Sequence, residues 1–133
     1  MSEADIQVIR DQFDAVNRRD FTRAMELYAD DVVMTVHSAE GVPAPGTYVG
    51  KEAVGSWFGD WFRTFGRDYR IEIDEAEAIG DAIFLHAWHS GQGRASRVEV
   101  RGEFAYLYRV RDGLVSRVGF FATREEARAA AKA

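Results

Sequence analysis

The 133-residue sequence contains no cysteine, which excludes a disulfide framework, a thiolate nucleophile and a cysteine metal site. It has no apolar run of the roughly 18 residues needed to span a bilayer. The polar residues at positions 1–5 show no basic-then-hydrophobic signal pattern. We therefore expect a soluble, cytoplasmic protein with no membrane partner.

Basic residues are too few to form a broad positive surface. The sequence has 17 Lys and Arg against 22 Asp and Glu, a net charge of -5. A nucleic-acid backbone is recruited mainly by positive charge, so we expect no nucleic-acid partner. The preference for arginine over lysine and the common alanine and glycine suggest a GC-rich bacterial gene. The length predicts one domain spanning residues 1–133.

Sequence motifs for cofactors and metals are also missing. The chain contains no GxxxxGK[ST], GxGxxG, GxSxG or HExxH motif. His86 and His89 lie three residues apart on one predicted strand, so they point to opposite faces and do not share a metal. We expect neither a cofactor nor a metal.

Hydrophobic periodicity predicts the order of the secondary structure. Apolar residues at helical spacing predict a helix that starts after Ser2 and closes near Arg19, a short helix from Asp20 to about Asp30, and a third helix from Lys51 to Phe65. Strand patterns cover Val32–His37, Tyr69–Ile79, Ala82–Ser90, Val98–Val110 and Leu114–Ala122. Thr123 and Glu126 form a capping box for a last helix. This order predicts an α+β domain with helices on one face of a curved sheet, whose concave face can hold a pocket.

Four segments carry a family resemblance: residues 13–31 (FDAVNRRDFTRAMELYADD), 46–54 (GTYVGKEAV), 110–115 (VRDGLV) and 123–131 (TREEARAAA). In this order and spacing they resemble the SnoaL-like branch of the nuclear transport factor 2 (NTF2) superfamily, which is related to the ketosteroid isomerases. The resemblance implies a cone-shaped barrel, with helices packed on the concave face of a curved, mainly antiparallel sheet that is often a dimer interface. Members include isomerases, polyketide cyclases, epoxide hydrolases, dehydratases and proteins without catalytic activity, so the fold leaves the function open.

The family's best-understood catalytic residues are not retained. The aspartate base of the isomerases falls at Val36, their phenolic donor near Gln12, and their second acid near Tyr106. Of these, only Tyr106 retains a hydroxyl donor. The aspartate-arginine-aspartate group of limonene epoxide hydrolases has no match among the inward positions.

We predict His89 and Tyr106 as the catalytic pair. Strand alternation points His89 into the cone, where it would act as a general acid, a general base or a polar anchor. Tyr106 would donate a hydrogen bond to a carbonyl or enolate. The alternative for both is a core side chain whose polar atoms are satisfied by neighbours. Alternation turns His86 outward, and His37 away from the cavity.

Further inward positions are predicted to contact the ligand. They are Tyr108, Trp57, Trp61, Phe120, Val118, Val36 and Asn17. For the tryptophans the competing interpretation is ordinary core packing at helical spacing, and for Asn17 it is a helix C-cap. The segment from Gly41 to Gly46, with both prolines, is interpreted as a rim loop. The segment from Gly41 to Tyr48 could serve as a lid.

The opposite face of the sheet is predicted to be a homodimer interface. Its charged residues alternate in sign along the strands, and apolar residues share the face. The charged set is Glu99, Arg101, Glu103, Arg109, Arg111 and Arg117, and the apolar set is Phe84, Trp88, Leu107 and Phe121. A merely solvated face is the alternative.

Three functional hypotheses follow. The first is a pocket protein for an apolar, cyclic small molecule, with cofactor-free isomerase, cyclase or hydratase chemistry. The second is a non-catalytic ligand-binding or dimerisation module. The third, a protein-binding surface like that of NTF2 itself, rests on fold analogy alone. A cavity above about 300 Å³ would favour the first hypothesis.

Overall fold

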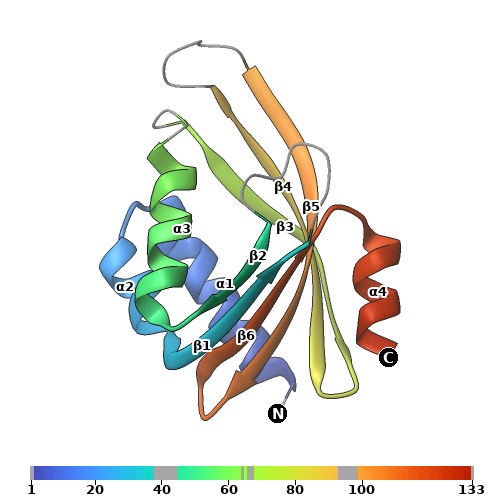
Figure 1. The fold of residues 1–133 in the computed structure, drawn as a ribbon. Helices are drawn as coiled ribbons and strands as arrows, with labels where there is room; N and C mark the ends of the chain where they lie inside the picture. The colour runs from blue at the N-terminus through green and yellow to red at the C-terminus, as the bar shows by residue number, and fades with distance from the viewer. Residues whose placement is uncertain (1, 38–44, 64, 66–67, 93–98, 133) are drawn as a thin grey trace.

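The computed structural model describes residues 2–37, 45–63, 65, 68–92 and 99–132. The elements follow one another as α1 (Ser2–Asn17), α2 (Phe21–Glu26), β1 (Tyr28–Val36), β2 (Gly46–Val49), α3 (Lys51–Arg63), β3 (Arg70–Ile79), β4 (Ala82–Gln92), β5 (Glu99–Arg111), β6 (Leu114–Phe121) and α4 (Arg124–Lys132) (Figure 1). This arrangement confirms the predicted α+β class.

The helices form where apolar spacing and caps agree. In α1, Ile9 and Phe13 are four residues apart, lie on one face and are buried. The side chain of Asp20 accepts a hydrogen bond from the Arg23 backbone N–H at 3.1 Å and thereby caps α2. At the other end of the chain, Thr123 Oγ1 accepts from the Glu126 N–H at 3.2 Å, as predicted for the cap of α4.

The six strands form one sheet in the order β2-β1-β6-β5-β4-β3. All neighbours pair antiparallel except β1 and β6, which are parallel. In the described part of the chain β2 and β3 are the two free edges, so the barrel is not closed by strand pairing. The β5–β6 turn has Asp112 at φ 54° and Gly113 at φ 78°, the paired left-handed conformations of a tight hairpin.

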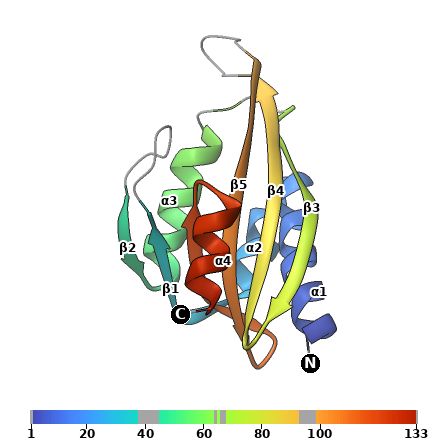
Figure 2. The ribbon, with the colours of Figure 1, turned by 90° about the vertical axis from the view of Figure 1, so that its right-hand side faces the viewer.

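Helices cover both faces of the sheet. The helices α1, α2 and α3 lie on the concave side (Figure 1), and α4 crosses the other side (Figure 2). The main core lies between the sheet and α1–α3 and includes Tyr106, Tyr108 and Phe120. A smaller core under α4 contains Phe84, Phe121 and Ala127.

The position of α4 changes the interpretation of the outer face. Phe84 and Phe121, which the sequence analysis placed in a dimer interface, are buried beneath α4 of the same chain. Glu75 on β3 pairs with both Arg124 and Arg128 of α4. Part of the face assigned to a partner is therefore covered within one chain.

Several predicted boundaries differ from the structure. The second helix ends at Glu26 rather than near Asp30, because the Leu27 carbonyl accepts from the Val115 N–H at 2.8 Å and Tyr28 already pairs in the sheet. The third helix ends at Arg63. Residues 46–48 of the predicted lid belong to the edge strand β2, which pairs with β1. The rest of the predicted lid, residues 41–44, lies outside the described residues.

In the described residues, no helix is both long and apolar enough to cross a membrane.

Candidate functional site

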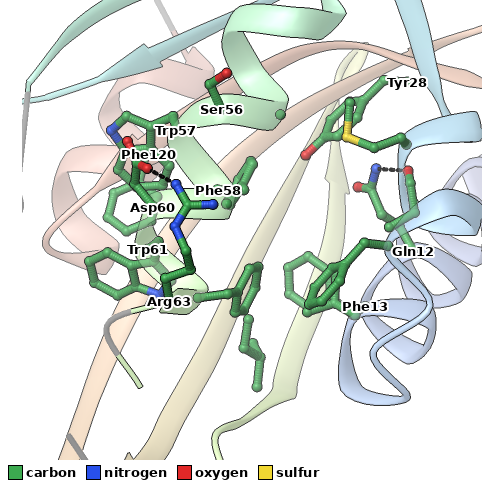
Figure 3. A pocket seen from close by; sticks show the side chains of 18 of the residues that line it. Gln12, Phe13, Tyr28, Ser56, Trp57, Phe58, Asp60, Trp61, Arg63 and Phe120 are labelled. Carbon is green, nitrogen blue, oxygen red and sulfur yellow. Dashed lines mark hydrogen bonds and ion pairs between the residues drawn. The ribbon is translucent and has the colours of Figure 1, made fainter. Parts of the chain in front are cut away.

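A cavity of about 1160 Å³ lies between the concave face of the sheet and the three helices α1–α3. This volume exceeds the lower bound of about 300 Å³ set for a ligand pocket. Its interior is mostly aromatic: Phe13 projects from α1, Trp57 and Trp61 from α3, and Phe120 from β6 (Figure 3). Trp57 and Trp61 stack with their ring centroids 5.7 Å apart. The cavity is therefore shaped for an apolar ligand with flat surfaces.

The charged lining residues of α3 lie on its exposed side. Glu52 and Asp60 are the carboxylates among the described lining residues, and both are exposed. Asp60 pairs with Arg63 of the same helix. Phe21 of α2, 41% exposed, contacts Phe62 of α3 at 5.4 Å between ring centroids. Within the described lining, the interior therefore carries polar groups without carboxylates.

A chain of hydrogen bonds runs through the sheet side of the cavity. Trp61 Nε1 donates to Tyr69 Oη at 2.7 Å, and Tyr69 Oη is hydrogen-bonded to His89 Nδ1. His89 Nε2 lies 2.9 Å from Tyr106 Oη. His89 is 3% exposed, and both of its ring nitrogens bond to tyrosine hydroxyls rather than to the backbone. The chain thus links four side chains from α3, the segment before β3, β4 and β5.

Burial keeps the titratable side chains of this hydrogen-bond chain neutral. It lowers the pKa of His89 from 6.5 to about 3, because the imidazolium would lose its hydration. Burial likewise raises the pKa of Tyr69 and of Tyr106 above the usual value for tyrosine. At neutral pH the imidazole therefore carries one N–H donor and one acceptor nitrogen, and both phenols keep their hydrogens.

The donors in the chain fix its direction. The Trp61 indole can only donate, so Tyr69 Oη accepts from it and passes its own hydrogen to His89 Nδ1. His89 then carries its proton on Nε2 and donates to Tyr106 Oη. The reverse direction would leave the Tyr69 hydrogen without an acceptor among the described residues. The Tyr106 hydroxyl hydrogen is consequently left for a group inside the cavity.

Tyr69 is the member of this chain that the sequence analysis missed. Two residues before the inward Ile71, it shares the same side of the chain, and this parity was the available signal. Its approach to β4 depends on Gly91, because a Cβ at Gly91 would lie 2.7 Å from the Tyr69 Cα. Gly91 therefore makes room for Tyr69.

The predicted site residues divide into two groups. Those that line the cavity are His89, Tyr106, Tyr108, Trp57, Trp61 and Phe120. Those that do not, within the described lining, are Val36, Val118 and Asn17. The two valines do face the concave side, but they are covered by the main core.

Asn17 joins α1 to the sheet instead of facing a ligand. Its Nδ2 donates to the Ile71 carbonyl at 2.8 Å, and its Oδ1 accepts from the Ile71 N–H at 2.9 Å. Ile71 pairs with His89 in the β3–β4 ladder. Asn17 therefore contributes indirectly to the cavity, because it positions the strand beside His89.

The other two histidines lie on the outer face, as predicted. His86 is buried near α4, with Nδ1 2.5 Å from Asp74 and 3.2 Å from Arg124. His37 is exposed and stacks on Phe121 at 4.2 Å between ring centroids. In the described part of the chain, no group of three His, Asp or Glu side chains is arranged to hold a metal ion.

Comparison with known proteins identifies the family. The sequence model of the SnoaL-like domain family matches residues 9–118 of this chain. Among curated proteins, none matches the chain.

Solved structures share the fold at low sequence identity. TerC, co-crystallised with polyporic acid, is 15% identical with a TM-score of 0.76, over 98% of this chain and 99% of that one. A putative SnoaL-like polyketide cyclase from Jannaschia sp. CCS1 is 16% identical with a TM-score of 0.73, over 91% and 86%. RV0760c from Mycobacterium tuberculosis, in complex with estradiol-17beta-hemisuccinate, is 20% identical with a TM-score of 0.74, over 92% and 95%. These likenesses, together with those to two structures described as NTF2-like proteins, confirm the NTF2-like fold.

Proposed function

The chain belongs to the SnoaL-like domain family, and from this premise we propose that it binds a small, apolar, cyclic molecule and holds a carbonyl group of that molecule on the Tyr106 hydroxyl. The observation that carries the proposal is the directed chain from Trp61 through Tyr69 and His89, which leaves the Tyr106 hydrogen facing the cavity. The aromatic walls supply the apolar contacts, and one fixed donor supplies the orientation. The similar folds solved with polyporic acid and with estradiol-17beta-hemisuccinate support an organic ligand.

In this proposal Tyr106 touches the ligand and His89 positions Tyr106. A pKa of about 3 makes His89 a weak base at neutral pH, and both of its nitrogens already have partners. It therefore keeps Tyr106 oriented as a donor instead of taking a proton from the ligand. A donor held in a dry cavity stabilises negative charge that develops on a carbonyl oxygen, which suits isomerisation, cyclisation or hydration without a cofactor.

The second candidate is ligand binding without catalysis. It is favoured by Val36, which stands where the related isomerases hold their base and is buried in the core. It is also favoured by the exposed location of Glu52 and Asp60, the carboxylates of the described lining. Turnover of a bound ligand separates the candidates, because a binding module returns the ligand unchanged.

A thermal-shift screen tests the proposal. Wild type, Tyr106→Phe and His89→Ala are screened against steroids, aromatic polyketides, terpenoid epoxides and fatty acids. A ligand at about 100 times its Kd adds roughly 2.7 kcal/mol to the stability of the wild type. We expect one carbonyl-bearing class to stabilise the wild type and to lose most of this effect in Tyr106→Phe.

The matched control is Tyr48→Phe, which removes a phenol hydroxyl from β2 outside the described lining. This variant should respond to ligand like the wild type. Equal stabilisation of wild type and Tyr106→Phe would refute the role of Tyr106. No stabilisation by any class would refute the pocket proposal itself.

A homodimer through the outer face and a cytoplasmic location remain part of the proposal. Arg101 lies over the Trp88 ring at 4.8 Å, beside the area that α4 covers, and supports an exposed contact patch there. Arg109 and Arg111 pair with Asp81 and Asp31 of their own chain, which reduces the charge available to a partner. Sedimentation of wild type against Trp88→Glu tests the dimer: a monomeric wild type refutes it.

A further inference from the structure

Gln12 presents an unused hydrogen-bond acceptor beside the cavity. It lies on α1, is 2% exposed and belongs to the cavity lining. Its Nε2 donates to the Ala24 carbonyl at 3.1 Å, which fixes the orientation of the carboxamide. Its Oε1 has no hydrogen-bond partner among the described residues. A buried carbonyl oxygen without a partner is unusual in a folded protein, because nearly all such groups are paired.

Tyr28 presents a hydroxyl to the same part of the cavity. It is a buried lining residue at the start of β1, and its ring stacks on Phe58 at 6.4 Å between centroids. Among the described residues its hydroxyl has no hydrogen-bond partner. Burial raises the pKa of Tyr28, so the phenol stays neutral and keeps its hydrogen to donate. Figure 3 shows the Tyr28 hydroxyl and the Gln12 carboxamide directed into the cavity from the side opposite Trp61 and Phe120.

We propose that Gln12 and Tyr28 form a second polar subsite, which binds a hydroxyl group of the ligand. The ligand hydroxyl donates its hydrogen to Gln12 Oε1 and accepts a hydrogen from Tyr28 Oη, so both protein groups are satisfied by one atom and its hydrogen. An amide N–H or an ammonium group would satisfy Gln12 but has no lone pair to offer Tyr28. An ether or ketone oxygen would satisfy Tyr28 and leave Gln12 unpaired.

This inference rests on the proposed function and narrows its ligand class. Tyr106 offers a donor, which selects a carbonyl, whereas Gln12 offers an acceptor, which selects a hydroxyl. The ligand class is then an apolar cyclic compound with a carbonyl and a ring hydroxyl at different positions.

Calorimetric titration of two matched probes tests the subsite. The probes are 2-naphthol and 2-methoxynaphthalene, which share the ring system and differ in the hydroxyl hydrogen and one methyl group. Because the ether is poorly soluble, the protein is placed in the syringe. We expect Gln12→Met to weaken 2-naphthol about tenfold and to leave the ether within about twofold, since an unpaired or lost polar group costs this much affinity.

Tyr28→Phe and Tyr48→Phe complete the design. Tyr28→Phe should weaken 2-naphthol by about fivefold and weaken the ether as well, because both oxygens can accept from the Tyr28 hydroxyl. Tyr48→Phe, outside the described lining, should leave both probes unchanged. Gln12→Met keeps the Leu27 N–H on the Ala24 carbonyl, so α2 retains that bond, and Tyr28→Phe supplies a second variant should Gln12→Met fold poorly.

The outcomes separate the subsite from the pocket. If Gln12→Met leaves the preference between the two probes unchanged, or Tyr28→Phe leaves the affinity for 2-naphthol unchanged, the hydroxyl subsite is refuted and the apolar pocket stands. If neither probe binds the wild type, the apolar-ring pocket is refuted and the subsite with it. Selective loss of 2-naphthol in Gln12→Met, together with weaker binding of 2-naphthol in Tyr28→Phe, establishes the subsite independently of Tyr106.

Discussion

Acidification should destabilise this protein through its buried imidazole. His89 has a pKa of about 3 in the folded protein, whereas the imidazole of an unfolded chain titrates near 6.5. Between these two values the unfolded state binds a proton that the folded state does not. The free energy of unfolding is therefore fully present above about pH 6.5 and falls as the pH drops toward 3.

The magnitude follows from the width of that window. Each pH unit within it costs up to about 1.36 kcal/mol, so at about pH 4.5 the loss reaches roughly 2.7 kcal/mol. The ring contacts of His89 with Phe104 and Trp61 are apolar, and its hydrogen-bond partners Tyr69 and Tyr106 are neutral phenols. None of these neighbours carries a charge that would compensate an imidazolium. For a domain stabilised by about 5–15 kcal/mol, this loss is large.

Urea unfolding at several pH values between about 8 and 4.5 measures the effect, with His89→Gln as the matched variant. Glutamine retains a donor and an acceptor but does not titrate. All other ionisable groups are common to both proteins, so the difference between their pH slopes isolates His89. Equal slopes in wild type and His89→Gln would show that the imidazole is not held neutral, and would refute the assigned direction of the hydrogen-bond chain.

Three other perturbations test separate parts of the structure. Gly91→Ala should weaken ligand binding and lower the free energy of unfolding in urea by about 1–3 kcal/mol, because its Cβ would meet Tyr69 at 2.7 Å. Gly102→Ala on the adjacent strand has open space around it and should lower that free energy by less than about 1 kcal/mol. Similar costs at the two glycines would contradict the packing argument. Asn17→Ala should lose about 1–3 kcal/mol through its two backbone hydrogen bonds to β3, and an unchanged urea midpoint would count against that role. Phe84→Ala, which empties a fully buried position under α4, should cost about 3–5 kcal/mol in the same assay, and a cost near zero would mean that α4 does not cover it.

The sequence was sufficient to predict on which face of the sheet the polar groups lie. Period-two alternation put His89 on one side of β4, and Tyr106 and Tyr108 on one side of β5, and the structure has all three lining the same cavity. Alternation does not predict, however, whether an inward side chain reaches the cavity or is covered by other side chains. Val36 and Val118 have the predicted parity and are still hidden beneath other core side chains.

Most of the features that could not be predicted from the sequence depend on tertiary contacts. The Tyr69–His89 bond joins residues 20 apart in the chain, and it requires the close approach that Gly91 permits. Strand β2 has four residues and little burial, so it shows no periodicity, and it is defined by its pairing with β1. The amphipathic α4 was predicted, but local spacing does not tell which surface a helix will cover.

The parallel pairing of β1 with β6 makes folding depend on an encounter between distant parts of the chain. Val36 on β1 is paired with Phe120 on β6, while β2, α3, β3, β4 and β5 lie between them in sequence. During synthesis β1 has only the short β2 beside it until about residue 120 has left the ribosome. The aromatic wall of the cavity therefore forms late, and nascent chains should expose it to chaperones for most of their synthesis. Closing so long a loop before its contacts are gained also slows refolding relative to a helical bundle of this length.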